Sequence, residues 1–194
     1  MRGSSSGQPR SSIKVVRKSI GQRLPANRPR SSTNAELRRF APLPRMTDAP
    51  FRLALDIHPA DEKDRTLLVE NGWSLVSPRE VAGDPWKYQD FIRGSLAEFM
   101  IAKNIYVQTH SGWFSDRSIC YLASGRPVVA QDTVLGAEYR DGSGLVLFND
   151  VEGAAEAVRR IRRDYQSHCR AARAFAVEHF DSDRVLSQML ERLG

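Results

Sequence analysis

The sequence predicts an α/β fold in which a mostly parallel sheet carries helices on both faces. Of its 194 residues, 41% are hydrophobic, which is enough for the core of one domain. After Pro50, short apolar segments typical of strands alternate with longer segments of helical period. Strands separated by helices need crossover connections, and such connections place neighbouring strands parallel.

The expected elements follow one another from Phe51 to the end of the chain. We expect strands over residues 51–57, 73–76, 105–107, 127–130 and 144–148. We expect helices over residues 61–71, 85–102, 115–124, 151–168, 170–179 and 183–193. The helix over 85–102 is predicted because Asp84 can cap it, Pro85 suits its first turn, and its apolar residues fall roughly on one face.

The first 47 residues differ from the rest in composition. They contain 11 Lys or Arg residues against the single acid Glu36, so the net charge of +6 leaves about −4 on residues 48–194. Ser, Arg, Pro and Gly dominate this segment, and no apolar period is sustained in it. We therefore expect a basic disordered tail over 1–47 and one domain over 48–194. Such a tail attracts nucleic acid only weakly and in a salt-sensitive way, and a solvated extension is the favoured interpretation.

Several classes of function find no support in the sequence. No window approaches 18 consecutive apolar residues and no secretory signal is recognisable, so we expect a cytoplasmic protein. Cys120 and Cys169, with four scattered histidines, have no metal-ligand spacing, so we expect neither a metal nor a cofactor. A Gly-rich phosphate loop, a nucleophile elbow and a paired-cysteine motif are also missing from the sequence.

Ligands of parallel sheets bind at the carboxyl ends of the strands, here in the loops after Ile57, Val107, Ala130 and Phe148. In residues 111–118, Gly112 permits close approach of a ligand to the backbone, and Ser115 or Asp116 can cap the helix that follows. The free N–H groups of that helix suit an anion such as a diphosphate, and Arg117 adds a charge-assisted contact.

Each of these candidate sites has an alternative interpretation. Residues 111–118 also fit an ordinary capped helix, with Trp113 and Phe114 as core anchors. Asp132 and Thr133 follow a buried strand at the edge where ligands bind, but they equally fit a polar turn. From residue types and spacing alone, these alternatives stay open.

A family resemblance rests on several segments taken together. The segments Glu98–Lys103, Tyr106–Val107, Ser111–Ser118 and Tyr121–Val129 resemble the C-terminal, donor-binding half of a GT-B glycosyltransferase, within a bacterial subgroup. The likeness continues through 131–133, 144–145 and 180–186, and it covers nearly everything from about residue 51 onward.

The resemblance implies a Rossmann-like domain that is one half of a GT-B architecture and binds a nucleotide sugar as substrate. The related retaining enzymes carry two Glu residues here, and Gly112 and Cys120 stand in their places. The polar residues left for donor binding are Asp116, Arg117 and Asp132, with Gly112, Ser115 and Thr133 beside them; no catalytic residue is assigned.

The acceptor in this family is held mainly by an N-terminal half, which the resemblance does not include. The final helix of the family often crosses to that half, so a partner domain or chain is expected over residues 185–193. The alternative function is a truncated, non-catalytic domain that acts as a binding or interaction module.

Overall fold

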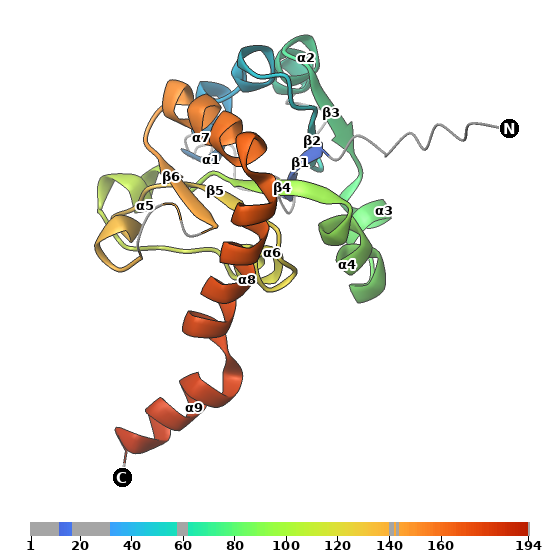
Figure 1. The fold of residues 1–194 in the computed structure, drawn as a ribbon. Helices are drawn as coiled ribbons and strands as arrows, with labels where there is room; N and C mark the ends of the chain where they lie inside the picture. Colours follow the sequence, from blue (N-terminus) through green and yellow to red (C-terminus); the bar gives the residue numbers. More distant parts are fainter. Residues whose placement is uncertain (1–11, 17–31, 58–61, 140–141, 143, 194) are drawn as a thin grey trace, which may run out of the picture.

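The structure is a computed structural model that describes residues 12–16, 32–57, 62–139, 142 and 144–193 (Figure 1). Its strands are β1 (Ser12–Val16), β2 (Phe51–Ala54), β3 (Trp73–Val76), β4 (Ser95–Met100), β5 (Val128–Gln131) and β6 (Leu145–Phe148). Its α-helices are α1 (Ser32–Arg39), α2 (Glu62–Glu70), α3 (Pro78–Ala82), α4 (Pro85–Arg93), α5 (Asn104–Gln108), α6 (Asp116–Ala123), α7 (Val151–Arg163), α8 (Tyr165–Phe180) and α9 (Ser182–Glu191). Two short 3₁₀ helices are η1 (Leu43–Met46) and η3 (Leu135–Ala137).

The six strands form one parallel sheet in the order β3-β2-β1-β4-β5-β6, which confirms the predicted α/β class. From β1 the chain builds outward to β2 and β3, then returns to the other side of β1 with β4 and continues to β5 and β6. The direction of winding therefore changes between β1 and β4. In open parallel sheets, ligands bind beyond the carboxyl ends of the strands at such a switch point.

Helices cover both faces of the sheet (Figure 1). On one face α1, α2 and α7 enclose a core in which the rings of Phe40, Phe51, Phe99 and Phe148 contact one another. On the other face α4, α6 and α8 enclose a second core, in which Tyr121 is fully buried. Rings at these separations add packing energy beyond the area they bury, so the sheet is held firmly from both sides.

The expectation of a disordered tail over 1–47 is wrong for β1, α1 and η1. Strand β1 pairs with β2 through Ile13 and Phe51 and with β4 through Ile13 and Ala97, so it lies in the middle of the sheet. The domain therefore begins by residue 12 rather than residue 48. The prediction failed because it rested on the average composition of residues 1–47, in which the five residues of β1 are outnumbered by Ser- and Arg-rich sequence. Residues 1–11 and 17–31 of the predicted tail lie outside the described residues.

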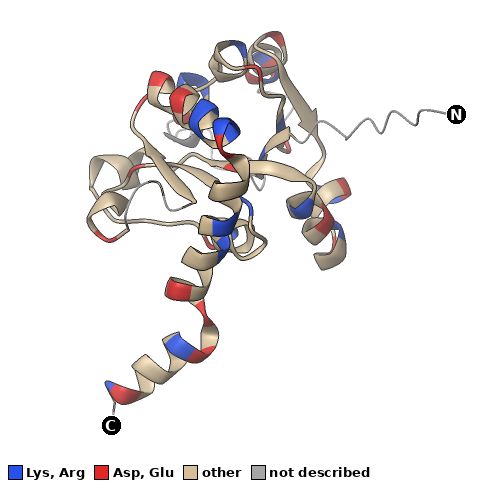
Figure 2. Cartoon of the chain, viewed as in Figure 1, with Lys and Arg blue, Asp and Glu red and all other residues tan. Residues whose placement is uncertain are grey.

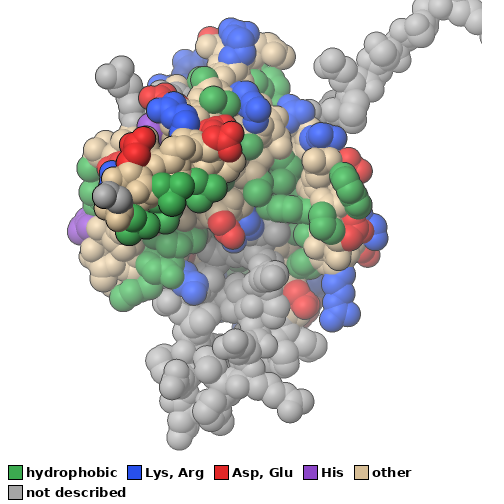
Figure 3. All heavy atoms as spheres, turned by 90° about the horizontal axis from the view of Figure 1, so that it is seen from below, with side chains coloured by type: hydrophobic (Ala, Val, Ile, Leu, Met, Phe, Trp, Pro, Cys, Tyr) green, Lys and Arg blue, Asp and Glu red, His purple; other side chains and the backbone are tan. Residues whose placement is uncertain are grey.

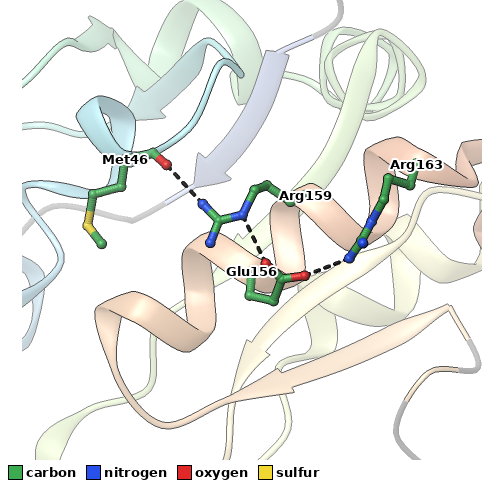
Figure 4. Close-up of polar contacts among 4 residues, drawn as sticks. All are labelled: Met46, Glu156, Arg159 and Arg163. Atoms are coloured by element: carbon green, nitrogen blue, oxygen red, sulfur yellow. Dashed lines mark hydrogen bonds and ion pairs between the residues drawn. The ribbon is translucent and has the colours of Figure 1, made fainter.

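Helix α7 ties part of that same segment to the domain. The Arg159 guanidinium donates one hydrogen bond to the Met46 carbonyl (3.1 Å) and another to the Glu156 carboxylate (2.9 Å), which also accepts one from Arg163 (2.6 Å) (Figure 4). Acidic residues in the first half of α7 give way to basic ones in the second (Figure 2). This order suits the helix dipole.

Two further predictions around β4 are wrong. The predicted helix over 85–102 ends at Arg93, and residues 95–100 are β4 instead. The predicted strand over 105–107 is part of α5, so the loop after Val107 does not follow a strand. Residues 95–100 are largely apolar except for Glu98 and are nearly all buried, and such a segment fits a helix as well as a central strand. The remaining predicted strands and helices are present, with shifted ends.

Helix α9 extends away from the body of the domain (Figure 1). None of its residues is buried, and apolar side chains gather along it where Figure 3 views the molecule from below. Its exposed apolar residues are Val185, Leu186, Met189 and Leu190, and the exposed Leu193 follows just after the helix. No helix in the described part of the chain has the length and apolar character needed to cross a membrane.

Replacing Ile13 by Ala tests the central position of β1. Ile13 is 1% exposed, so we expect the variant to lose about 3 kcal/mol of unfolding free energy through lost burial and the cavity left behind. Chemical denaturation measures this loss. Ile105→Ala is the matched control, because Ile105 is 53% exposed and its loss costs less than about 0.5 kcal/mol. Equal stabilities of the two variants would contradict a buried central β1.

Candidate functional site

The candidate site lies where β4 and β5 end. From β4 the chain passes through α5 and the loop 109–115 into α6, and from β5 it passes directly into η3. Two hydrogen bonds join these connections: the Gly112 amide donates to the Thr133 carbonyl (2.7 Å), and the Thr133 hydroxyl donates to the Trp113 carbonyl (2.8 Å). The structure thus brings the predicted residues Gly112 and Thr133 together. Thr133 is fully buried, so its side chain holds the two loops together.

Asp132 and the residues after it form a tight turn. The Asp132 amide donates to the Phe148 carbonyl (2.8 Å), and its carboxylate accepts from the Leu135 amide (2.7 Å) at the start of η3. Val134 has a φ of +77°, a conformation that a β-branched residue rarely adopts. The loop after β5 is therefore a polar turn, as one of the two interpretations of Asp132 and Thr133 predicts. The Asp132 side chain is half-buried in this turn.

The first turn of α6 is capped by its own residues. The Ser115 hydroxyl accepts from the Arg117 amide (3.3 Å), and the Asp116 carboxylate accepts from the same amide (2.9 Å). Ser115 is fully buried, whereas Asp116 is exposed. Among the described residues no acid forms an ion pair with Arg117, and its Nε is buried without a hydrogen-bond partner. The Arg117 side chain is half-buried, and in the part of the chain that the structure describes no acid competes with a ligand for its guanidinium.

Gly112 occupies a backbone conformation that favours glycine, with a φ of +65°. A Cβ atom added there meets no other atom within 4 Å, so this part of the loop faces open space. Behind it, Trp113 stacks on Tyr106 with ring centroids 5.0 Å apart, and Phe114 stacks on Phe180 at 5.9 Å. Trp113 and Phe114 both pack against the second core, as the core-anchor interpretation predicts.

A second polar group at this edge joins three elements. The Gln131 side chain donates to the Glu36 carboxylate on α1 (3.1 Å) and accepts from the Ala102 amide after β4 (3.1 Å). Both side chains are buried, so these bonds fix α1 against the ends of β4 and β5. Glu36 was grouped with the tail and Gln131 was assigned no contact with it, so this pair was missed.

Sequence reasoning also missed Glu98, which it placed on a helix. Glu98 lies on β4, is 1% exposed, and interacts with residues of the first turn of α6. Burial raises the pKa of Glu98 to about 7, although the Ser118 hydroxyl and the Arg117 charge act in the opposite direction. Its Oε2 has no hydrogen-bond partner among the described residues.

Two tyrosines are buried near Glu98. The hydroxyl groups of Tyr88 on α4 and Tyr121 on α6 also have no partner among the described residues. Burial, and next the negative charge of Glu98, raise the pKa of both phenols. Both tyrosines are therefore neutral at physiological pH, and neither hydroxyl group donates a hydrogen bond to Glu98.

Known proteins similar to this chain are found by comparing structures and not by comparing sequences. No protein-family model matches the sequence, and no curated protein matches it. The structure is similar to that of sucrose-phosphate synthase from Thermosynechococcus elongatus, with a TM-score of 0.60 and 12% identity over 96% of this chain and 46% of that chain. It is also similar to TarM, with a TM-score of 0.57 and 15% identity over 93% of this chain and 35% of that chain. A third similar structure is a UDP-forming α,α-trehalose-phosphate synthase from Burkholderia vietnamiensis, with a TM-score of 0.54 and 12% identity over 95% of this chain and 46% of that chain.

The chain has the fold of one half of a GT-B glycosyltransferase. It spans less than half the length of each of these three enzymes, which agrees with a single Rossmann-like half. At 12–15% identity the likeness establishes the fold, and the site must be argued from the residues of this half-domain.

Replacing Glu98 by Gln tests the electrostatic state of the buried carboxyl. Because the folded-state pKa is raised, ionised Glu98 destabilises the fold above about pH 7, and this penalty disappears as the pH falls toward the unfolded-state value near 4.5. We expect the variant to be more stable than wild type by about 3 kcal/mol at pH 8 and the two to converge near pH 4.5.

Chemical denaturation over this pH range measures the difference. Glu80→Gln is the control, because Glu80 is exposed on α3, and the same substitution at an exposed site should change the free energy of unfolding by less than about 0.5 kcal/mol. A pH-independent difference for the Glu98 variant would contradict a buried, weakly acidic carboxyl.

Proposed function

We propose that this half-domain binds a nucleotide sugar at the carboxyl ends of β4 and β5 and serves as the donor half in glycosyl transfer. The observation that carries the proposal is the pair of connections joined through Gly112 and Thr133, followed by the first turn of α6, where Arg117 forms no ion pair with any described residue. They lie beside the switch point of the sheet, where parallel α/β folds bind ligands. The GT-B fold supports sugar transfer as the reaction class.

Each candidate residue has a separate role in this proposal. Arg117 supplies charge-assisted hydrogen bonds to the diphosphate, and the open backbone at Gly112 lets the ligand approach closely. Asp116 and Asp132 offer carboxylate oxygens to hydroxyl groups of the nucleotide or sugar. Ser115 and Thr133 are buried and keep the loops in place.

Asp116 also sets a condition on donor binding. Its carboxylate occupies the Arg117 amide at the first turn of α6, the position that a phosphate oxygen would take. A bound diphosphate therefore displaces this carboxylate toward solvent, where Asp116 is already exposed.

The proposed role is donor binding rather than complete catalysis. Transfer requires an acceptor held in line with the anomeric carbon of the donor sugar. The described residues correspond to one half of the enzymes with this fold, so we assign the acceptor to a second domain or chain.

Titration calorimetry of the folded protein with UDP-glucose, ADP-glucose and GDP-mannose tests this proposal. A UDP-sugar comes first because the Burkholderia vietnamiensis neighbour is described as UDP-forming. We expect saturable binding of one donor. Arg117→Ala should weaken that binding about 10- to 100-fold, since a charge-assisted hydrogen bond contributes about 1.5–3 kcal/mol.

Arg79→Ala on α3 is the matched control, because Arg79 is exposed on an element that does not form the site. It should bind the donor as wild type does. Failure of every donor to bind, or equal binding by the Arg117 variant, would contradict the proposed site.

A binding or interaction module is the second candidate function, and one observation favours it. Helix α9 exposes an apolar stripe that includes Leu190, which is 69% exposed. Exposed apolar stripes of this kind mark contact surfaces for other chains or domains. A monodisperse monomer that binds no hydrophobic dye would count against this function.

A further inference from the structure

A buried group of polar side chains lies directly beneath the first turn of α6. We call it the Glu98 cluster; it consists of Tyr88, Glu98, Arg117, Ser118 and Tyr121. The cluster joins three elements, because Tyr88 comes from α4, Glu98 from β4 and the other residues from α6. Arg117 and Ser118 belong to the same first turn that faces the proposed donor site.

Among the described residues, no basic side chain forms an ion pair with the carboxyl of Glu98. Lys14 on β1 is its register partner, yet the Lys14 ammonium donates to the Phe91 carbonyl at 2.6 Å and forms no ion pair with Glu98. The register partner on β5 is the apolar Val128. An unpaired buried carboxylate is costly, and the cost falls when the group takes up a proton.

The charges that face Glu98 come mainly from α6. Arg117 favours the ionised form, whereas Asp116 favours the protonated form. The remaining titratable groups that Glu98 influences are Tyr88, Cys120 and Tyr121. Burial and the charge of Glu98 raise the pKa of each of these three groups, so all three are neutral near pH 7. Glu98 is therefore the group of this cluster that titrates near neutrality.

Donor binding changes this balance of charges. A diphosphate at the first turn of α6 brings negative charge close to Glu98, and it engages the Arg117 guanidinium that otherwise stabilises the carboxylate. Both effects favour the protonated carboxyl. The uncharged carboxyl also has an O–H that can donate to one of the unpartnered hydroxyl groups around it.

We propose that Glu98 couples donor binding to proton uptake: a diphosphate that binds at the first turn of α6 is accompanied by transfer of one proton from solvent to the Glu98 carboxylate. This inference rests on the proposed function, because it concerns the same site. The step is a single protonation: the Glu98 carboxylate gains one proton from the buffered solvent, and no other covalent bond forms or breaks.

The coupling has a defined direction with pH. Burial raises the pKa of Glu98 to about 7. In this proposal the pKa rises further when a diphosphate binds, because the added negative charge disfavours the carboxylate. Donor affinity is therefore constant well below pH 7, where Glu98 is already protonated. Above pH 7 it falls, by up to tenfold per pH unit for a single proton, until the pKa of the bound state is passed.

Calorimetry in buffers of different ionisation enthalpy counts the protons directly. The titrants are UDP-glucose, ADP-glucose and GDP-mannose, whose linked phosphates keep their charge near neutral pH. At pH 7.5 we expect wild type to take up a substantial fraction of one proton on binding. Glu98→Gln should bind with no proton uptake and with an affinity that is flat from pH 6 to 8.5, because an amide mimics the protonated carboxyl. Glu80→Gln should behave as wild type.

The outcomes separate this inference from the proposed function. Donor binding without proton uptake by wild type, or an unchanged pH dependence in Glu98→Gln, overturns the coupling and leaves the proposed function standing. Absence of binding by every donor overturns both. Carboxyl-carbon NMR of wild type labelled at Glu avoids any folding defect of the variant, because the Glu98 resonance must shift toward the protonated form when donor is added at pH 7.5. An unshifted resonance overturns the coupling.

Discussion

The burial of β1 between β2 and β4 is the constraint on which the rest of the structure depends. Ile13 of this strand is almost fully buried, and its pairing on both sides creates the reversal of winding between β1 and β4. That reversal places the ends of β4 and β5 beside the switch point, where their connections can surround a ligand. Without β1, β2 and β3 would not pair with the strands that carry the candidate site.

Two layers of polar contacts then shape the edge of the sheet. An outer layer joins the connections through Thr133 and leaves Gly112 facing open space. An inner layer lies beneath α6, where Glu98 is buried and its Oε2 has no hydrogen-bond partner among the described residues. The first turn of α6 belongs to both layers, because Arg117 lies in it with one nitrogen buried and its charge lowers the pKa of Glu98. This shared helical turn is the physical reason to expect ligand charge and the protonation of Glu98 to depend on each other.

Much of the fold follows from patterns in the sequence, and the exceptions have physical causes. Capping by Ser115 and Asp150, with Gly125 in a left-handed conformation after α6, marks helix ends that local rules recognise. Strand β4 was missed because buried central strands lack the alternation that separates strands from helices. Strand β1 was missed because its stability comes from neighbours distant in sequence, and the partnerships of Glu98 and Glu36 depend on the same tertiary contacts.

Amide NMR during addition of UDP-glucose is the most direct test of the central claim that a donor binds at the ends of β4 and β5. The account predicts that the largest shifts occur at Gly112, Arg117 and Asp132, with smaller ones along the first turn of α6. Residues at the opposite edge of the sheet, such as Gly94 before β4, should remain unchanged. Shifts confined to α9 or to that opposite edge would contradict the account.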